Sequence, residues 1–134
     1  MNSEELGHLA ADLDTVVWVV CDFHGVDKTK LFDVSHNSED YRSARSMYVL
    51  LGLMIGATFE QMVIHAGRRH GHNTIKNWYR AGVHRWNWAT YRVALQIVVE
   101  HLRRVLERES IDRYDLQKAA TEFAEERWRL MHAM

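Results

Sequence analysis

A chain of 134 residues is long enough for one domain with a single core. Hydrophobic residues make up 47% and charged residues 26%, which is the balance of a globular chain rather than a disordered one. Proline is absent and glycine occurs only seven times, whereas a β-sandwich or barrel needs many turns that recruit both residues. The composition therefore predicts an all-α fold.

Acidic and basic residues are distributed unevenly along the chain, although the net charge is only -1. Residues 1–40 hold nine acidic side chains against two lysines, whereas residues 61–99 hold six Lys or Arg and no Asp or Glu. Four histidines in the second stretch would add positive charge at lower pH. This segregation predicts a surface for an anionic partner, with DNA as the first candidate, or else a solvated basic helix without a ligand.

Apolar residues recur at helical spacing along almost the whole chain. The pattern predicts an acidic helix over about residues 3–11 and a second helix over about 14–24 that ends at Gly25. The apolar run 16–20 also fits a buried strand, but no partner strand appears elsewhere in the sequence. The second helix is expected to bury Val16, Val17, Val20 and Phe23.

A short helix and a long helix are expected next. Asp27 is placed to cap a short helix that buries Leu31 and continues through Asp33, and residues 34–40 form a polar connection. The long helix ends near Ile55, and its predicted core positions are Ala44, Met47, Tyr48, Leu51 and Met54 or Ile55.

The central basic stretch predicts two short helices joined by a tight turn. Thr58 caps the first helix, residues 67–71 form the turn, and the second helix runs from about Asn73 to before Gly82. The residues expected to be buried on these helices are Phe59, Met62, Val63, Ala66, Ile75 and Tyr79 or Trp78.

The remainder of the chain predicts a helical hairpin over about residues 87–131. Its first helix carries a seam at alternating spacings of three and four: Trp88, Tyr91, Leu95, Val98, Leu102 and Val105. Its last helix carries Leu116, Ala120, Phe123 and Leu130 on one stripe. The apolar band on the first helix is too wide for one neighbour, so we expect a further contact, either with the N-terminal helices or with a partner such as a second copy.

Residues 58–80 have the anatomy of a helix-turn-helix, in which the second helix presents a polar face outward. Asparagine can pair with adenine, and Lys or Arg with guanine or phosphate. Asn73, Lys76, Asn77 and Arg80 are the outward candidates on this helix.

The stretch from about Asp14 to Trp86 resembles the C-terminal DNA-binding domain of the bacterial replication initiator DnaA. The segments that carry the resemblance are Val20–Val26 with Lys30–Phe32, Arg42–Met47, Thr58–Met62, Ala66–Arg69, and His72-Asn73-Thr74-Ile75, which is similar to the family's His-Thr-Thr-Val motif. The resemblance implies base contacts from His72, Asn73 and Thr74, with Arg69 alongside, and a buried role for Ile75.

The full set of expected DNA-binding residues adds phosphate contacts from the neighbouring cations. It comprises Arg45, Arg68, Arg69, His70, His72, Asn73, Thr74, Lys76, Asn77 and Arg80. The chain departs from the family at His70-Gly71, where the family has an Asp before its motif, and at residues 36–39, which lack the family's basic minor-groove loop. His36 could serve there when protonated. The initiator's ATP-binding loop is absent from the sequence.

Other kinds of site find less support in the sequence. His65, His70 and His72 lack nearby Cys or carboxylate ligands, so no metal or cofactor is expected. Cys21 lies among valines and is expected to be a buried hydrophobe, and no nucleophile–base arrangement indicates an enzyme. The aromatic cluster Trp78, Tyr79, Trp86, Trp88 and Tyr91 fits core packing better than stacking on single-stranded bases.

The sequence therefore predicts a DNA-binding region over residues 1–86 and a helical hairpin over 87–134 that packs on it and offers a homodimer or partner contact. The expected function is sequence-specific binding of double-stranded DNA by a stand-alone regulator of transcription or replication accessory, similar to phage-derived proteins. A phage packaging subunit of small-terminase type and a protein-interaction module that imitates the initiator stay open as alternatives. No membrane-spanning helix and no secretory signal are expected, which predicts a cytoplasmic, nucleoid-associated protein.

Overall fold

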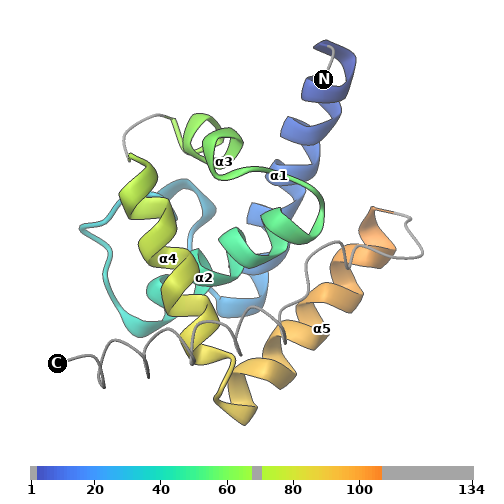
Figure 1. Ribbon diagram of the computed structural model, residues 1–134. Coiled ribbons are helices and arrows are strands. Elements are labelled where there is room, and N and C mark those ends of the chain that lie inside the picture. Colours follow the sequence, from blue (N-terminus) through green and yellow to red (C-terminus); the bar gives the residue numbers. More distant parts are fainter. Residues whose placement is uncertain (1–2, 68–70, 107–134) are drawn as a thin grey trace, which may run out of the picture.

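The computed structural model describes residues 3–67 and 71–106, and every regular element in these ranges is a helix (Figure 1). The elements are α1 (Ser3–His24), the one-turn 3-10 helix η1 (Lys28–Lys30), α2 (Glu39–Met54), α3 (Phe59–His65), α4 (His72–Arg85) and α5 (Ala89–Val105). The predicted all-α class is confirmed. The last helix of the predicted hairpin, with Leu116, Ala120, Phe123 and Leu130, lies outside the described residues.

The N-terminal part of the chain forms one long helix, α1, where the sequence predicted two. No glycine or proline separates residues 11 and 14, so the helical hydrogen bonds continue through this stretch. Val16 and Val20 are buried as expected, and Val17 is half-buried, but Phe23 is exposed and Val19 and Cys21 take its place in the core. This correction arises because α1 contacts both α2 and α5 and therefore buries a wider face than one neighbour requires.

The segment after α1 turns the chain toward α2. Gly25 adopts a positive φ of 66°, and Asp27 then caps η1 by accepting a hydrogen bond from the Thr29 amide at 2.9 Å. The regular turn is shorter than predicted, ending at Lys30, but Leu31 is fully buried as expected.

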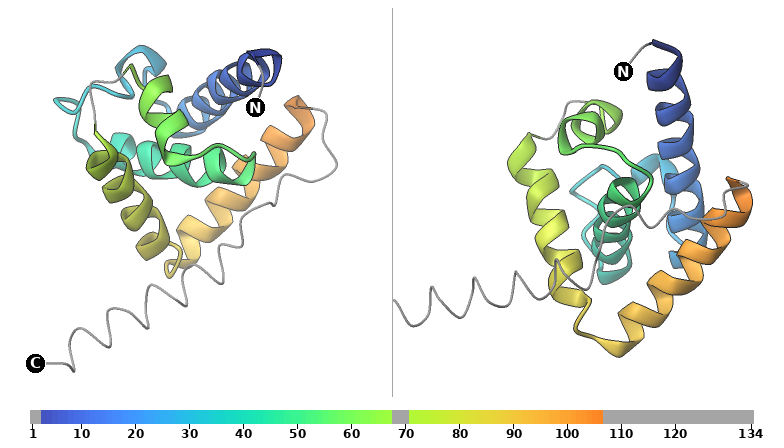
Figure 2. Two further views of the ribbon diagram at one scale, coloured as in Figure 1. Left: turned by 45° about the horizontal axis from the view of Figure 1, so that its top comes forward. Right: turned by 45° about the vertical axis from the view of Figure 1, so that its right-hand side comes forward.

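The centre of the molecule is α2, which runs between α4 on one side and α1 on the other (Figure 2). Every residue from Ala44 to Gly52 is buried, including all the predicted core positions in that range. A helix that is buried on all sides organises the elements around it.

Thr58 caps α3 as predicted, and the structure shows that it does so in a capping box. The Thr58 hydroxyl accepts a hydrogen bond from the Gln61 amide at 3.1 Å, and the Gln61 side chain accepts one from the Thr58 amide at 2.7 Å. The reciprocal pair fixes where this short helix starts.

α4 begins one residue earlier than predicted and continues past Gly82 to Arg85, so the prediction that it ends before Gly82 is wrong. Gly82 is buried against α2, and a Cβ atom there would lie 2.8 Å from Leu50 Cδ1 and 3.3 Å from the Ser46 carbonyl oxygen. The glycine therefore permits a close helix–helix approach and does not terminate the helix.

Gly82→Ala is expected to destabilise the protein, because the added methyl group forces α4 away from α2 or distorts Leu50. We expect a loss of about 1–3 kcal/mol in the free energy of unfolding, measured by urea denaturation. Gly7→Ala on α1 is the matched control, because nothing lies within 4 Å of its Cβ and the change should add about 0.5–1 kcal/mol. Equal effects of the two substitutions would contradict the close packing at Gly82.

α5 buries four of its six predicted seam residues, Tyr91, Leu95, Val98 and Leu102, and contacts α1. Trp88 and Val105, at the two ends of the seam, are exposed. Helix α1 thus supplies the further contact that was expected for the wide apolar band of α5. Among the described helices, none has the length and apolar character needed to cross a membrane.

Candidate nucleic-acid interface

The two sides of α4 differ sharply in chemistry. Its inner side holds the helix to the body through Ile75, Gly82 and Val83, which are buried. Two aromatic contacts add to this attachment: Trp78 stacks on Phe32 with ring centroids 6.2 Å apart, and Tyr79 meets Phe59 edge-on at 5.5 Å. The helix is therefore held against the body from Ile75 to Val83.

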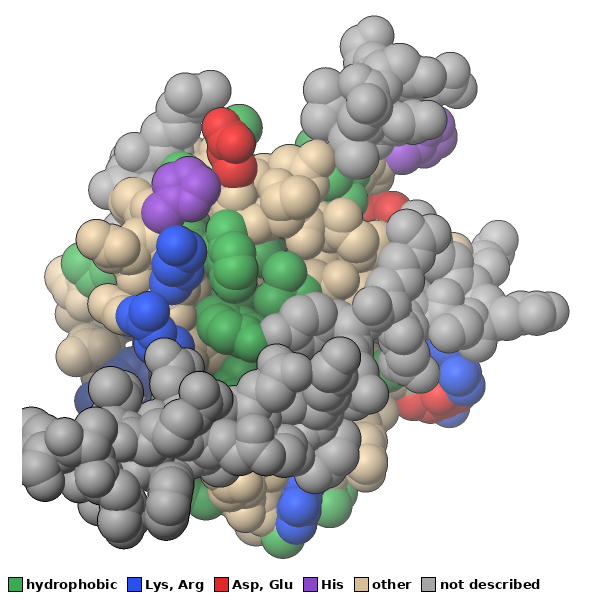
Figure 3. Space-filling view, in the orientation of Figure 1, with side chains coloured by type: hydrophobic (Ala, Val, Ile, Leu, Met, Phe, Trp, Pro, Cys, Tyr) green, Lys and Arg blue, Asp and Glu red, His purple; other side chains and the backbone are tan. Residues whose placement is uncertain are grey.

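The outer side of α4 is polar and positively charged. The exposed residues on it are His72, Asn73, Lys76, Asn77, Arg80 and His84, and Thr74 beside them is half-buried. The space-filling view shows Lys and Arg side chains following α4, with a histidine above them (Figure 3). We refer to His72, Asn73, Thr74, Lys76, Asn77, Arg80 and His84 as the α4 outer face.

No carboxylate of the described residues neutralises the cations of this face. Neither Lys76 nor Arg80 forms an ion pair within the part of the chain that the structure describes, and the sequence has no Asp or Glu from 61 to 99. Arg80 donates a hydrogen bond to the Asn77 side-chain oxygen at 3.2 Å, which leaves its remaining N–H groups for another acceptor. The face therefore offers cations and amides together.

The first turn of α4 has no side-chain cap. Its N-cap is Gly71, with extended backbone at φ -80° and ψ 177°, so Asn73 occupies the second helical position and does not cap the helix. The amide end of the helix dipole adds partial positive charge beside His72 and Asn73. The side chain of Asn73 is therefore available to a ligand.

Arg45 is a correction to the predicted phosphate contacts. Only 2% of the residue is exposed, and its guanidinium donates hydrogen bonds to the carbonyl oxygens of Leu31 and Asp33 at 2.6 Å each and to that of His36. The guanidinium carbon also lies 5.7 Å from the centroid of the Tyr41 ring and 5.9 Å from the centroid of the Trp78 ring. Burial lowers the pKa of Arg45, although an arginine stays charged at neutral pH. Arg45 therefore holds the 31–36 segment and is not placed to touch DNA.

The loop that corresponds to the family's minor-groove element is acidic and internally bonded. Glu39 forms ion pairs with Arg42 at 3.2 Å and with Arg85 at 2.9 Å. The His36 ring lies 3.9 Å from an Asp33 carboxylate oxygen and beside the Tyr41 ring. Nothing in this geometry adds a second cationic surface.

The aromatic cluster mostly packs inward. Trp78, Tyr79 and Trp86 are partly buried against the core, and Tyr91 is buried with its hydroxyl 2.9 Å from that of Ser46. Burial raises the pKa of Tyr91 to about 12. Only Trp88 of this cluster is exposed. This placement favours core packing over stacking on bases.

The structure contains a hydrogen-bonded chain that sequence reasoning missed. His65, considered above as a metal ligand, bonds through Nδ1 to the Tyr48 hydroxyl at 2.6 Å and through Nε2 to Asp14 at 2.7 Å. The chain joins the end of α3 to α1 and α2. Asp14 and His65 are 51 positions apart, so no local pattern could have indicated the contact.

Three predicted contacts, Arg68, Arg69 and His70, lie outside the described residues. Cys21 is buried as expected, and burial raises the pKa of its thiol to about 11, which keeps it protonated at neutral pH. Within the described ranges, no three His, Cys, Asp or Glu side chains are grouped to hold a metal ion.

Comparisons of the chain with protein-family models, curated proteins and solved structures found no match. The fold and the surface of α4 therefore define the structural class of the protein and do not assign it to a family. The described residues form an all-helical protein in which one firmly packed helix, α4, presents cations and amides outward.

Proposed function

We propose that α3 and α4 form a helix-turn-helix and that the α4 outer face binds double-stranded DNA with sequence preference. The observation that carries the proposal is the combination of Lys76, Arg80 and Asn73 on one exposed helix face, where no carboxylate of residues 3–67 and 71–106 pairs with either cation. The resemblance to the DnaA domain points to the same helix. A protein with this activity acts at the nucleoid, in the control of transcription or as a replication accessory.

The two kinds of side chain on this face support different roles. Lys76 and Arg80 carry full charge and long stems, which suits contacts to phosphate oxygens. Asn73 and Asn77 each offer an amide donor and acceptor, which suits the edge of adenine in the major groove. From His72 to Arg80 the helix rises by roughly 12 Å, a span close to the width of that groove.

The rigid attachment of α4 supports specificity as well as affinity. Base-edge contacts require side chains held within fractions of an ångström, and helices provide such positions better than loops. Ile75 and Gly82 fix the inner side of α4 against the core. Arg68, Arg69 and His70 stay in the proposal on the strength of the sequence alone, whereas Arg45 is removed from it.

The proposal predicts a salt-dependent duplex affinity that falls when α4 loses charge. Sites selected from random duplex DNA should bind in preference to unselected DNA, and Lys76→Ala and Arg80→Ala should each weaken binding to all sequences and lower the salt slope by about one unit. Fluorescence anisotropy across a salt series measures both quantities.

Arg104→Ala is the control, because Arg104 is an exposed arginine in the last turn of α5, whose first turn is the one that follows α4 in the chain. Its removal should leave the salt slope unchanged. Absence of duplex binding at moderate salt, or unchanged slopes in both α4 variants, would contradict the proposed function and would favour a protein-interaction module.

A further inference from the structure

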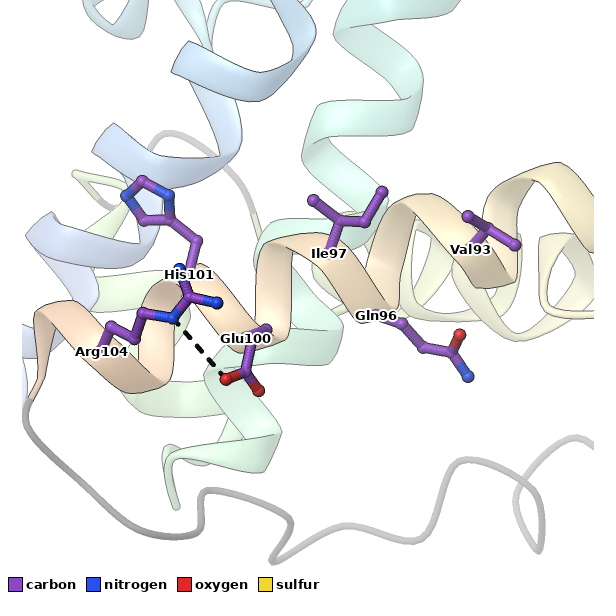
Figure 4. Close-up of a pocket in the computed structure, with 6 residues that line it drawn as sticks. All are labelled: Val93, Gln96, Ile97, Glu100, His101 and Arg104. Carbon is purple, nitrogen blue, oxygen red and sulfur yellow. Dashed lines mark ion pairs between the residues drawn. The ribbon is translucent and has the colours of Figure 1, made fainter.

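α5 has a second apolar face, opposite the seam that packs on α1. Val93 and Ile97 are 54% and 53% exposed, and they lie one turn apart along a pocket that α5 residues line (Figure 4). Trp18 of α1, which is 46% exposed, extends this face, because its ring lies 6.1 Å from that of His101. Large exposed apolar side chains that adjoin one another indicate a contact surface.

Charged residues flank this apolar face in a definite order. Arg92, Gln96, Glu100 and Arg104 follow one another at intervals of four residues, so they form one row along the helix. Glu100 already pairs with Arg103 at 2.5 Å and with Arg104 at 3.7 Å. Arg92 forms no ion pair with any residue that the structure describes. Among the described residues, the row therefore contains a cation without an ion pair, two turns from a carboxylate.

We propose that a second copy of this chain docks on this face, with the two α5 helices antiparallel and a two-fold axis near Gln96. In this register Arg92 lies opposite Glu100 of the second copy, and the symmetry makes the pair twice. A parallel arrangement would instead place Arg92 opposite Arg92 and Glu100 opposite Glu100, which is repulsive. Charge complementarity thus selects both the occupant and its direction.

The apolar residues fit the same arrangement. Ile97 lies next to the proposed axis and packs against Ile97 of the second copy. Val93 packs beside this pair of isoleucines. The net charge of -1 means that two copies do not repel each other at long range. One helix pair with Trp18 at its edge is a small interface, for which micromolar association is typical.

The dimer presents two α4 helices that are related by the two-fold axis, so each helix can contact one half-site of a DNA duplex. That use of the dimer rests on the proposed function. The dimer itself does not, because it is measured without DNA. A dimer that binds no duplex would contradict only the proposed function, and a monomer that binds duplex would contradict only the present inference.

A charge swap tests the pairing on the full-length chain by sedimentation equilibrium across a wide concentration range. The parent should be a dimer at high concentration, and Arg92→Glu should weaken dimerisation by at least about tenfold. The double variant Arg92→Glu with Glu100→Arg should restore it, because the exchanged charges again face each other. Circular dichroism checks that each variant stays folded.

Cysteine cross-linking tests the position of the axis. Gln96→Cys should form an intermolecular disulfide under mild oxidation, whereas Asn77→Cys on the α4 outer face should not, and the buried Cys21 is present in both. A monomeric parent would overturn the proposal and indicate that another part of the chain or another protein covers the face. A dimer that Arg92→Glu leaves intact, or that cross-links equally at both positions, would also overturn it.

Discussion

Replacing Arg45 with methionine is expected to lower the free energy of unfolding by about 3–4 kcal/mol. Methionine keeps much of the buried apolar stem but removes every donor. The carbonyl oxygens of Leu31, Asp33 and His36 would then lose the N–H groups that satisfy them in a region where Arg45 is almost fully buried. Loss of the charge above the Trp78 ring adds to the cost.

Urea denaturation measures this effect, and two variants define its origin. Arg42→Met removes an exposed arginine from the same helix, whose ion pair with Glu39 is worth less than about 1 kcal/mol. Arg45→Lys keeps the charge but not the planar fork, so it should recover only part of the stability. If Arg45→Met unfolds within about 1 kcal/mol of the parent, the hydrogen bonds to the 31–36 segment contribute little.

Periodicity and composition were sufficient to predict the all-α class and most of the helices, because helical spacing and capping are local properties. Thr58 and Asp27 cap the predicted helices through side chains one turn away or less. The predicted end of α4 was wrong at Gly82, because a glycine within a helical pattern indicates either the end of a helix or a close approach of two helices. Only the position of Leu50 on α2 decides between these two roles. Phe23 was misplaced because the neighbours of α1 come from distant parts of the chain.

The candidate surface was predictable to the extent that it depends on one helix. Lys76, Asn77 and Arg80 share a face by spacing alone, and the structure shows that face exposed. The role of Arg45 could not be predicted, because its partners are carbonyl groups 9 to 14 positions earlier in an irregular segment. An arginine in a chain that is expected to bind DNA suggests phosphate contact until the acceptors that bury it are known.

The α4 outer face predicts that Asn73→Asp abolishes site-specific DNA binding without loss of stability. A carboxylate at Asn73 can no longer donate to a base and repels the phosphates, so affinity for a selected site should fall on the order of a hundredfold. Because Gly71 is the N-cap, Asn73 is the second helical residue, where an acidic side chain interacts favourably with the helix dipole. The melting temperature should therefore stay the same or rise slightly.

Thr90→Asp provides the matched control, because Thr90 is the exposed second residue of α5 and receives the same charge at the same helical position. It should melt like Asn73→Asp yet retain specific binding, because α5 begins after the C-terminal end of α4 (Figure 1), whereas Asn73 lies in the first turn of α4. Asn73→Ala separates the lost contact from the added repulsion and should cost about 1–3 kcal/mol on the selected site and much less on random DNA. If Asn73→Asp binds the selected site as tightly as the parent, the first turn of α4 does not contact bases, and the specificity must come from another part of the chain.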